Sequence, residues 1–153
     1  MKADPAVQSR YGLVVVDTNV LLSAALAPGG VPAMLVDRLL DVGRLVFSPT
    51  TFAELEGRIW LPKFDRYLTI KYRRHILQQA HAAAVWIDIP AELAQRVFSR
   101  DPNDDAFIHA ALAAGAPCLI TGDADLLCLD PLGELRILTP RAALDELVAG
   151  PTA

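Results

Sequence analysis

An uninterrupted apolar run, Leu13–Val16, ends directly on an acidic residue, Asp17, and this junction limits the folds open to the chain. Three of the four apolar residues are valines, whose β-branched side chains favour strands. A strand without polar alternation is typical of the centre of a parallel sheet that is covered on both faces. Helical patterns and further short apolar runs then alternate along the chain. We therefore expect an α/β fold, a three-layer α/β/α sandwich with a mostly parallel central sheet.

The other elements are predicted from periodicity and from helix-breaking residues. Strands are expected at 13–16, 44–47, 86–89, 118–121 and 135–138. Helical patterns are expected at 21–26, 31–42, from about 51 to an interruption at 62, 69 to about 85, from 101–103 to 115, 123–127 and 140–148. No repeat or linker divides the chain, so we expect a single domain over residues 1–153. Its core is expected at about 12–149, with loose ends at 1–11 and 150–153.

The composition predicts a globular protein of the cytoplasm. The chain has 153 residues, 53% of them apolar, which is enough for a substantial core. Its longest apolar stretches fall far short of the roughly 20 residues that cross a bilayer, and no apolar segment behind the N-terminus could serve as a signal peptide. Without such a signal, Cys118 and Cys128 are expected to be reduced thiols. We expect no contact with a membrane.

The charge distribution restricts any contact with nucleic acid to a local patch. A net charge of −4 is not that of a basic protein that coats nucleic acid. Basic residues nevertheless concentrate between residues 58 and 74, where Asp65 is the one acid. Such a run is either a solvated helix face or a patch that contacts phosphates. The candidate RNA contacts within it are Arg66, Lys71, Arg73 and Arg74.

Four acidic residues follow or adjoin the predicted strands. Asp17 follows one strand directly, Glu54 is expected in the first helical turn after another, and Asp123 comes shortly after a third. Asp104 opens the helix that leads into that third strand. Ligands of open parallel sheets bind outside the carboxyl ends of the strands, so these side chains can converge on one edge. Clustered carboxylates are kept together mainly when a cation neutralises them, and their hard oxygens suit Mg²⁺ or Mn²⁺.

Each acid also has a structural interpretation. The spacing of Thr51 and Glu54 fits a capping box, so Glu54 either stabilises its helix or serves the site. Asp104 lies in a first helical turn, where the helix dipole favours anions, and Asp123 can cap the helix that follows it. Asp17 has no obvious structural partner, which makes it the strongest candidate. If the four converge, a bound metal supports hydrolysis of a phosphodiester.

Four segments resemble, in order and spacing, the motifs of PIN-domain nucleases. They are Val15–Ser23, Ser48–Leu55, Asp101–Ile108 and Leu119–Leu127. The resemblance spans residues 13–140 and extends to the branch that contains toxin components of bacterial and archaeal toxin–antitoxin pairs, relatives of the VapC-type ribonucleases. It implies a parallel sheet, a Mg²⁺ or Mn²⁺ site and endonucleolytic cleavage of RNA. As partners it implies RNA, a cognate antitoxin and a second copy of the chain in a homodimer.

The resemblance assigns roles residue by residue. The catalytic and metal-binding quartet is Asp17, Glu54, Asp104 and Asp123. Supporting positions are Asn19, Thr121, Asp105 and Asp125. Asn19 matches the polar residue that supports the first acid, and Thr121 matches the hydroxyl residue before the fourth. Counting back from the glycine that ends the helix favours Asp104 over its neighbour Asp105.

Other classes fit the sequence less well. A phosphatase of the haloacid dehalogenase type needs a second Asp two residues after the first, where Asn19 stands. A phosphorelay receiver needs paired acids at the end of its first strand, and Asp17 has no acidic neighbour. A PIN-like binding module without nuclease activity would be signalled by loss of an acid, and all four are present. RNA and single-stranded DNA both stay open as substrates, because no feature reads the 2′-hydroxyl.

Overall fold

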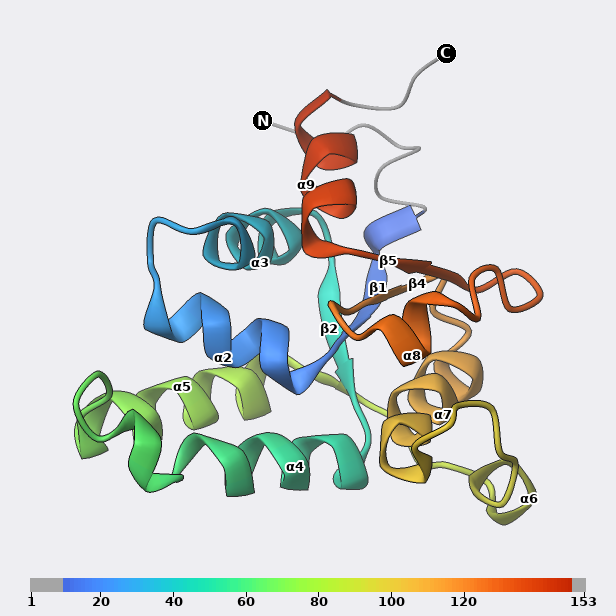
Figure 1. Ribbon diagram of the computed structural model, residues 1–153, viewed down its shortest axis with the longest axis horizontal. Helices are drawn as coiled ribbons and strands as arrows, with labels where there is room; N and C mark the ends of the chain where they lie inside the picture. Colours follow the sequence, from blue (N-terminus) through green and yellow to red (C-terminus); the bar gives the residue numbers. More distant parts are fainter. Residues whose placement is uncertain (1–9, 150–153) are drawn as a thin grey trace.

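The structure, a computed structural model, describes residues 10–149 and contains a parallel sheet at its centre (Figure 1). Its strands are β1 (Leu13–Val16), β2 (Arg44–Phe47), β3 (Val85–Trp86), β4 (Cys118–Ile120) and β5 (Arg136–Leu138). They lie in the order β3-β2-β1-β4-β5, and each neighbouring pair is parallel. The predicted α/β fold with a parallel sheet is therefore confirmed.

Helices connect the strands and cover both faces of the sheet. They are α2 (Thr18–Leu26), α3 (Val31–Val42), α4 (Pro49–Ile59), α5 (Ile70–Ala83), α6 (Ala91–Ala94), α7 (Asp105–Ala114), α8 (Ala124–Leu127) and α9 (Pro140–Ala149), with 3₁₀ turns η1 (Pro62–Phe64) and η2 (Pro102–Asp104). Among residues 10–149 no single helix is long and apolar enough to span a membrane; α2 and α3 meet those criteria only as a pair bent by 109°.

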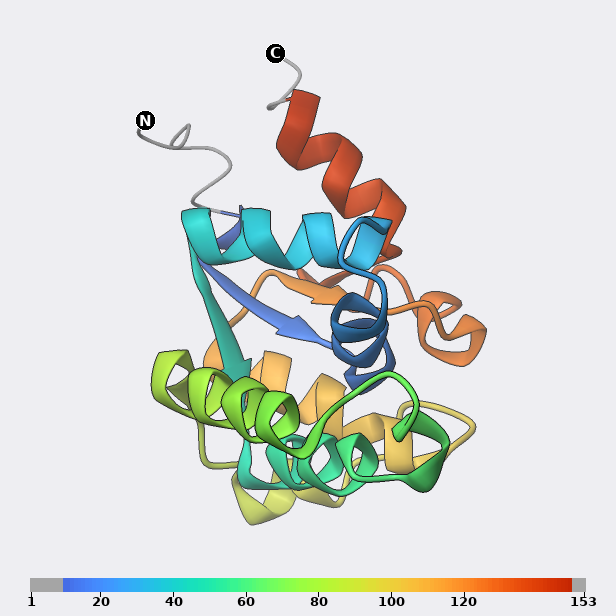
Figure 2. The same ribbon diagram turned by 90° about the vertical axis from the view of Figure 1, so that its left-hand side faces the viewer.

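Two apolar cores lie on opposite faces of the sheet because successive strand residues point in opposite directions. Val14 and Val16 face a core formed with α2, α3, α4, α5 and α9, the face seen in Figure 2. Val15 faces a second core, to which α7 and α8 contribute Phe107, Ile108 and Leu126 among others. This arrangement explains why the strand reads as a continuous apolar run.

The element boundaries differ from expectation at a few positions. The helix α4 begins at Pro49, earlier than the expected start near Thr51, because Ser48 caps it and proline suits a first helical position. The strand β3 ends at Trp86 and does not extend to Ile89, although the Ile87 amide still donates to the Phe47 carbonyl at 2.9 Å. The short helix α6 was not expected.

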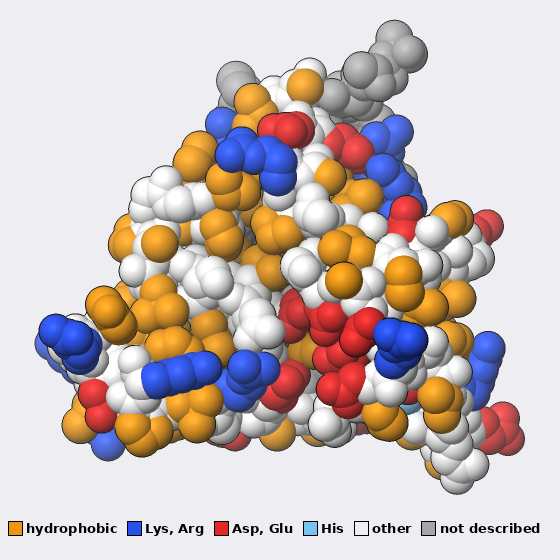
Figure 3. Space-filling view, viewed as in Figure 1, with side chains coloured by type: hydrophobic (Ala, Val, Ile, Leu, Met, Phe, Trp, Pro, Cys, Tyr) orange, Lys and Arg blue, Asp and Glu red, His pale blue; other side chains and the backbone are white. Residues whose placement is uncertain are grey.

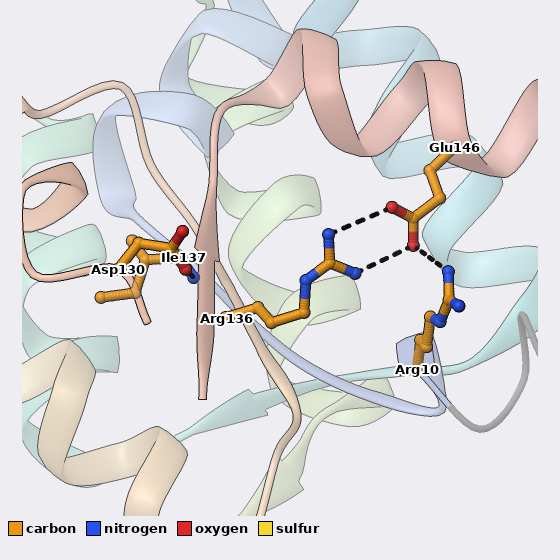
Figure 4. Close-up of polar contacts among 5 residues, drawn as sticks. All are labelled: Arg10, Asp130, Arg136, Ile137 and Glu146. Atoms are coloured by element: carbon orange, nitrogen blue, oxygen red, sulfur yellow. Dashed lines mark hydrogen bonds and ion pairs between the residues drawn. The ribbon is translucent and has the colours of Figure 1, made fainter. Parts of the chain in front are cut away.

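Ordered structure begins earlier than the expected residue 12. Tyr11 is fully buried, and Arg10 donates to Oε1 of Glu146 at 2.8 Å. Arg136 contacts the same carboxylate at 3.2 and 3.4 Å, so Glu146 joins the N-terminal segment, β5 and α9 (Figure 4). The rest of the ends that were expected to be loose, residues 1–9 and 150–153, lies outside the described residues.

Replacing Glu146 with Ala should lower stability, because two guanidinium groups lose their shared carboxylate. Burial acts to raise the pKa of Glu146, but hydrogen bonds from Arg10 and Arg136 outweigh it and hold the pKa below the ordinary 4.5. We expect a loss of about 1–2 kcal/mol at neutral pH, or about 3–6 °C in Tm. The loss should shrink as the pH falls below 4.5, where the carboxylate becomes protonated.

The exposed ion pair on the same helix supplies the control. Arg141 and Asp145 lie 3.9 Å apart with about two thirds of each side chain exposed, so Asp145→Ala should change stability by less than about 0.5 kcal/mol. Thermal unfolding of the two variants across the pH range compares them directly. Equal losses would contradict the role given to Glu146.

Candidate acidic site

The register of β1 and β4 places Asp17 beside Thr121. Val16 pairs with Ile120, and the Asp17 amide continues the pairing by donating to the Ile120 carbonyl at 2.9 Å. The Thr121 hydroxyl donates to Oδ2 of Asp17 at 2.7 Å, while Oδ1 accepts the Asn19 amide at 3.2 Å and caps α2. Asp17 thus has the structural partner that was not evident in the sequence. The contribution of Asn19 to this contact is its backbone N–H.

The same hydroxyl group also holds the fourth acid. The Asp123 amide donates to Oγ1 of Thr121 at 3.0 Å, and Oδ1 of Asp123 accepts the Asp125 amide at 2.9 Å, which caps α8. Thr121 therefore connects Asp17 to Asp123 through one oxygen atom. The expected capping role of Asp123 is present, and Asp125 supports it through the backbone.

The structure separates the roles of Asp104 and Asp105. Asp105 is buried and accepts the backbone amides of Phe98 and Ser99, at 2.7 Å for the Ser99 amide. It therefore holds the segment before η2 against α7. Asp104 makes no capping hydrogen bond and lies beside Asp123. Asp104 is the member of the pair that belongs to the acidic cluster.

Glu54 comes from the second turn of α4, because the helix begins before the residue expected from the sequence. The capping box consists of Ser48 and Thr51, whose side chains and amides bond each other, so Glu54 has no capping role. Its Oε2 accepts the hydroxyl of buried Thr18 at 3.1 Å, and its Oε1 lies 3.7 Å from Arg58. Thr18 directly follows Asp17, so this contact joins Glu54 to the site. The sequence gave no signal for Thr18.

The cluster is electrostatically strained. Burial, a hydrogen bond with Asp123 and the charges of Asp123, Asp101 and Asp17 raise the pKa of Asp104 to about 7. Figure 3 shows Asp and Glu side chains gathered in one patch between the start of α2, α7 and α8. Within residues 10–149 no set of three His, Cys, Asp or Glu side chains is arranged closely enough to hold an ion as it stands. Each carboxylate nevertheless keeps lone pairs beyond those used in the local hydrogen bonds.

One predicted RNA contact is unsuited to that role. Arg73 is 3% exposed, donates to Asp65 at 3.0 Å and lies 5.5 Å from the centre of the Trp60 ring. Its side chain therefore supports the hairpin between α4 and α5 and is not available to a phosphate. The other three candidates, Arg66, Lys71 and Arg74, are exposed.

A parallel α/β sheet with acidic side chains at the carboxyl ends of its strands defines the class of this protein. Residues 13–125 match the PIN domain, and the chain belongs to that family. This confirms the resemblance that its four motifs suggested. The chain is also 29% identical, over 143 residues, to the uncharacterized protein MJ1680 of Methanocaldococcus jannaschii, covering 87% of this chain and 90% of that protein.

Solved structures share the fold at low sequence identity. PAE2754 from Pyrobaculum aerophilum has a TM-score of 0.59 and 17% identity, covering 90% of this chain and 96% of that chain. A chain of VapBC2 from Rickettsia felis, bound to a DNA fragment from their promoter, has a TM-score of 0.57 and 17% identity, covering 83% and 98%. A chain of VapBC-1 from nontypeable Haemophilus influenzae has a TM-score of 0.54 and 17% identity, covering 84% and 98%.

Mn²⁺ should stabilise the protein more at about pH 8 than at about pH 6, because a proton on Asp104 competes with the cation. At about 100 times its Kd, a cation adds about 2.7 kcal/mol, or about 5–10 °C in Tm. Without metal the dependence has the opposite sign: the raised pKa of Asp104 makes stability fall as the pH rises towards 7. Asp104→Asn should flatten both dependences, whereas Asp41→Asn, on the exposed side of α3, should change neither. A pH-independent Mn²⁺ effect would contradict this electrostatic account.

Thr121→Val should weaken Mn²⁺ binding about 10–100-fold, because Asp17 and Asp123 lose the hydroxyl that orients them. Thr121→Ser retains the hydroxyl and should bind within about threefold of the natural protein. Isothermal titration measures the affinities, and thermal unfolding reports the accompanying loss of about 1–3 kcal/mol in the Val variant. Unchanged affinity in Thr121→Val would show that the hydroxyl does not position the acids.

Proposed function

We propose that this protein is a Mg²⁺- or Mn²⁺-dependent endoribonuclease. The observation that carries the proposal is the convergence of Asp17, Asp104 and Asp123 at one sheet edge. Among the described residues, no basic side chain forms an ion pair with any of the three. Their mutual repulsion is visible in the raised pKa of Asp104. Carboxylates in this state attract a divalent cation, and nuclease activity is typical of the PIN domain family.

The donor set fits such a cation. Asp17, Asp104 and Asp123 would hold it, with Glu54 completing the quartet from α4. A bound cation of this kind lowers the pKa of a water molecule and stabilises the charge that develops on the leaving oxygen. The chain's own contribution is orientation: Thr121 fixes two carboxylates, and Thr18 fixes the carboxylate of Glu54. Asp105 acts further out, by anchoring the segment that precedes Asp104.

We further propose that the protein is the toxin of a toxin–antitoxin pair in the cytoplasm, with an antitoxin and a second copy of itself as partners. Two of the structures that share its fold are chains of VapBC assemblies, which supports a protein partner. An antitoxin that silences the site is expected to place a basic side chain against the carboxylates. Arg58 beside Glu54 shows, within this chain, how a guanidinium group approaches the cluster.

The nuclease proposal predicts cleavage of labelled RNA with Mn²⁺ and no cleavage with EDTA. Asp17→Asn should reduce the cleavage rate at least about 100-fold, because it removes a charge from the metal site. Asparagine caps helices as well as aspartate does, so this variant preserves the start of α2. Gel analysis of RNA and of single-stranded DNA with the same sequence separates the two substrates.

Asp41→Asn is the matched control, since it makes the same change on an exposed part of α3 and should cleave at the natural rate. Cleavage that persists in EDTA, or full activity in Asp17→Asn, would overturn the mechanism. A folded protein that binds RNA but does not cleave it with either metal would instead be a PIN-like binding module. Release of phosphate from a monoester, without cleavage of RNA, would favour the phosphatase alternative.

A further inference from the structure

Beyond the acidic cluster, exposed basic and aromatic side chains share one segment of the surface. We call this the basic–aromatic surface; it consists of Arg58, Trp60, Lys63, Arg66 and Tyr67. These residues occupy the end of α4, the turn η1 and the chain that leads to α5. Between residues 58 and 74 the chain has six basic residues and one acid, although its net charge is −4. The segment is therefore a local exception to an acidic protein.

The basic–aromatic surface is continuous with the acidic cluster. The helices α2 and α4 both begin at the cluster and run side by side away from it, and η1 follows the far end of α4 (Figure 1). Arg58 lies between the two regions and contacts Glu54 at 3.7 Å. A helix rises about 1.5 Å per residue, so Trp60 lies about 9 Å beyond Glu54 along α4. Figure 3 shows Lys and Arg side chains in a row that leads away from the acidic patch in this direction.

The aromatic side chains on this surface are unusually exposed. Tyr67 is 66% exposed and Trp60 is 37% exposed. Tyr67 borders a hollow of about 300 Å³ that is also lined by Leu26, Lys63 and Phe64. The Lys63 ammonium lies 5.2 Å from the centre of the Phe64 ring, so positive charge sits directly beside the apolar hollow. An open aromatic ring next to a cation provides both the stacking surface and the charge that an unpaired nucleotide requires.

Arg73 keeps the hairpin rigid and its charge positive. Its buried guanidinium lies under Trp60 and pairs with Asp65, the one acid in the run. The ion pair neutralises Asp65, so the charges left at the surface are those of Arg58, Lys63 and Arg66. Because Trp60 already rests on Arg73, less side-chain entropy is lost when a base stacks against it.

The remaining basic residues of the run face another direction. Ile76 lines the hollow formed with α2 and α3, which fixes the inward side of α5. At about 100° per residue, Lys71 and Arg74 lie on the opposite side of that helix. They therefore lie away from the route along α2 and α4, although the sequence alone ranks them with Arg66. This difference separates the structure-based candidates from the sequence-based ones.

We propose that the basic–aromatic surface binds single-stranded RNA and directs it along α4 into the acidic cluster, with Lys63 and Arg66 at phosphates and Tyr67 stacked on a base. The inference rests on the proposed nuclease function and adds the location and the strandedness of its substrate. Charge complementarity favours a polyanion, and the exposed rings favour unpaired bases over a duplex, whose bases are already stacked. The bound strand reaches the site past Arg58, which exchanges Glu54 for a phosphate.

Binding is measured by fluorescence anisotropy of a labelled single-stranded RNA of about 12 nucleotides, in EDTA so that metal-dependent cleavage does not occur. Lys63→Gln/Arg66→Gln should raise Kd about tenfold and reduce the slope of log Kd against log salt concentration by about 1.4, or about 0.7 per lost phosphate contact. Tyr67→Ala should raise Kd about tenfold, while Tyr67→Phe retains the ring and should bind within about twofold of the natural protein. A duplex RNA of equal length should bind more weakly.

Two double variants with the same change of charge serve as comparisons. Lys71→Gln/Arg74→Gln tests the far side of α5 and should lose clearly less affinity than Lys63→Gln/Arg66→Gln. Arg38→Gln/Arg141→Gln alters exposed residues of α3 and α9 and should match the natural protein. An equal or larger loss in the α5 variant would overturn the inference, as would equal binding of duplex RNA together with no effect of Tyr67→Ala. RNA affinity that is independent of Lys63, Arg66 and Tyr67 would assign the surface to a protein partner.

The binding and cleavage assays fail independently. If RNA is cleaved at the acidic site but all surface variants bind normally, the inference is wrong and the nuclease proposal stands. If the surface variants lose affinity as expected but no metal supports cleavage, the RNA-binding surface stands and the nuclease proposal is wrong. A folded protein that neither binds nor cleaves RNA contradicts both.

Discussion

The parallel pairing of β1 with β4 is the contact on which the site depends. Its register aligns Val16 with Ile120, so the next residue of each strand, Asp17 and Thr121, must lie side by side. One hydroxyl group then fixes Asp17 and, through the next loop, Asp123. A slip of one residue would move Asp17 to the other face of the sheet and separate it from Thr121. The two apolar cores prevent such a slip, because it would also exchange their residues.

Helix capping and the acidic cluster use the same carboxylates. Asp17 caps α2 and Asp123 caps α8, so each is oriented by a backbone amide before any ligand arrives. Capping uses one oxygen of each carboxylate and leaves other lone pairs free, so a structural role does not exclude a role in the site. The sequence presented these roles as alternatives, whereas the structure combines them. Only for Glu54 does the structure remove the capping role, because Ser48 and Thr51 form the capping box.

Periodicity and motif order were sufficient to predict the sheet, most of its helices and the residues that follow its strands. The apolar run 13–16 and the helix 31–42 agree with the structure, because strong hydrophobic patterns and terminating residues determine both. What the sequence did not provide are contacts between distant segments. The bond from Thr18 to Glu54 and the ion pair that buries Arg73 join residues on different elements, and neither leaves a local pattern. Burial is the property of a charged residue that a basic run conceals most completely.

The opposite charges of the two surface regions are compatible because they bind different parts of one substrate. An acidic cluster without a cation repels RNA, whereas a basic surface nearby attracts it, so the two must be separated by less than the range of the attraction. Here α4 sets that separation, since Glu54 and Arg58 lie one helical turn apart and contact each other. Arg58 lowers the repulsion at the edge of the cluster, and its position on a rigid helix keeps both regions in a fixed relation. A strand of RNA bound beyond Arg58 would therefore approach the carboxylates along the helix, at the point where a cation makes their charge favourable.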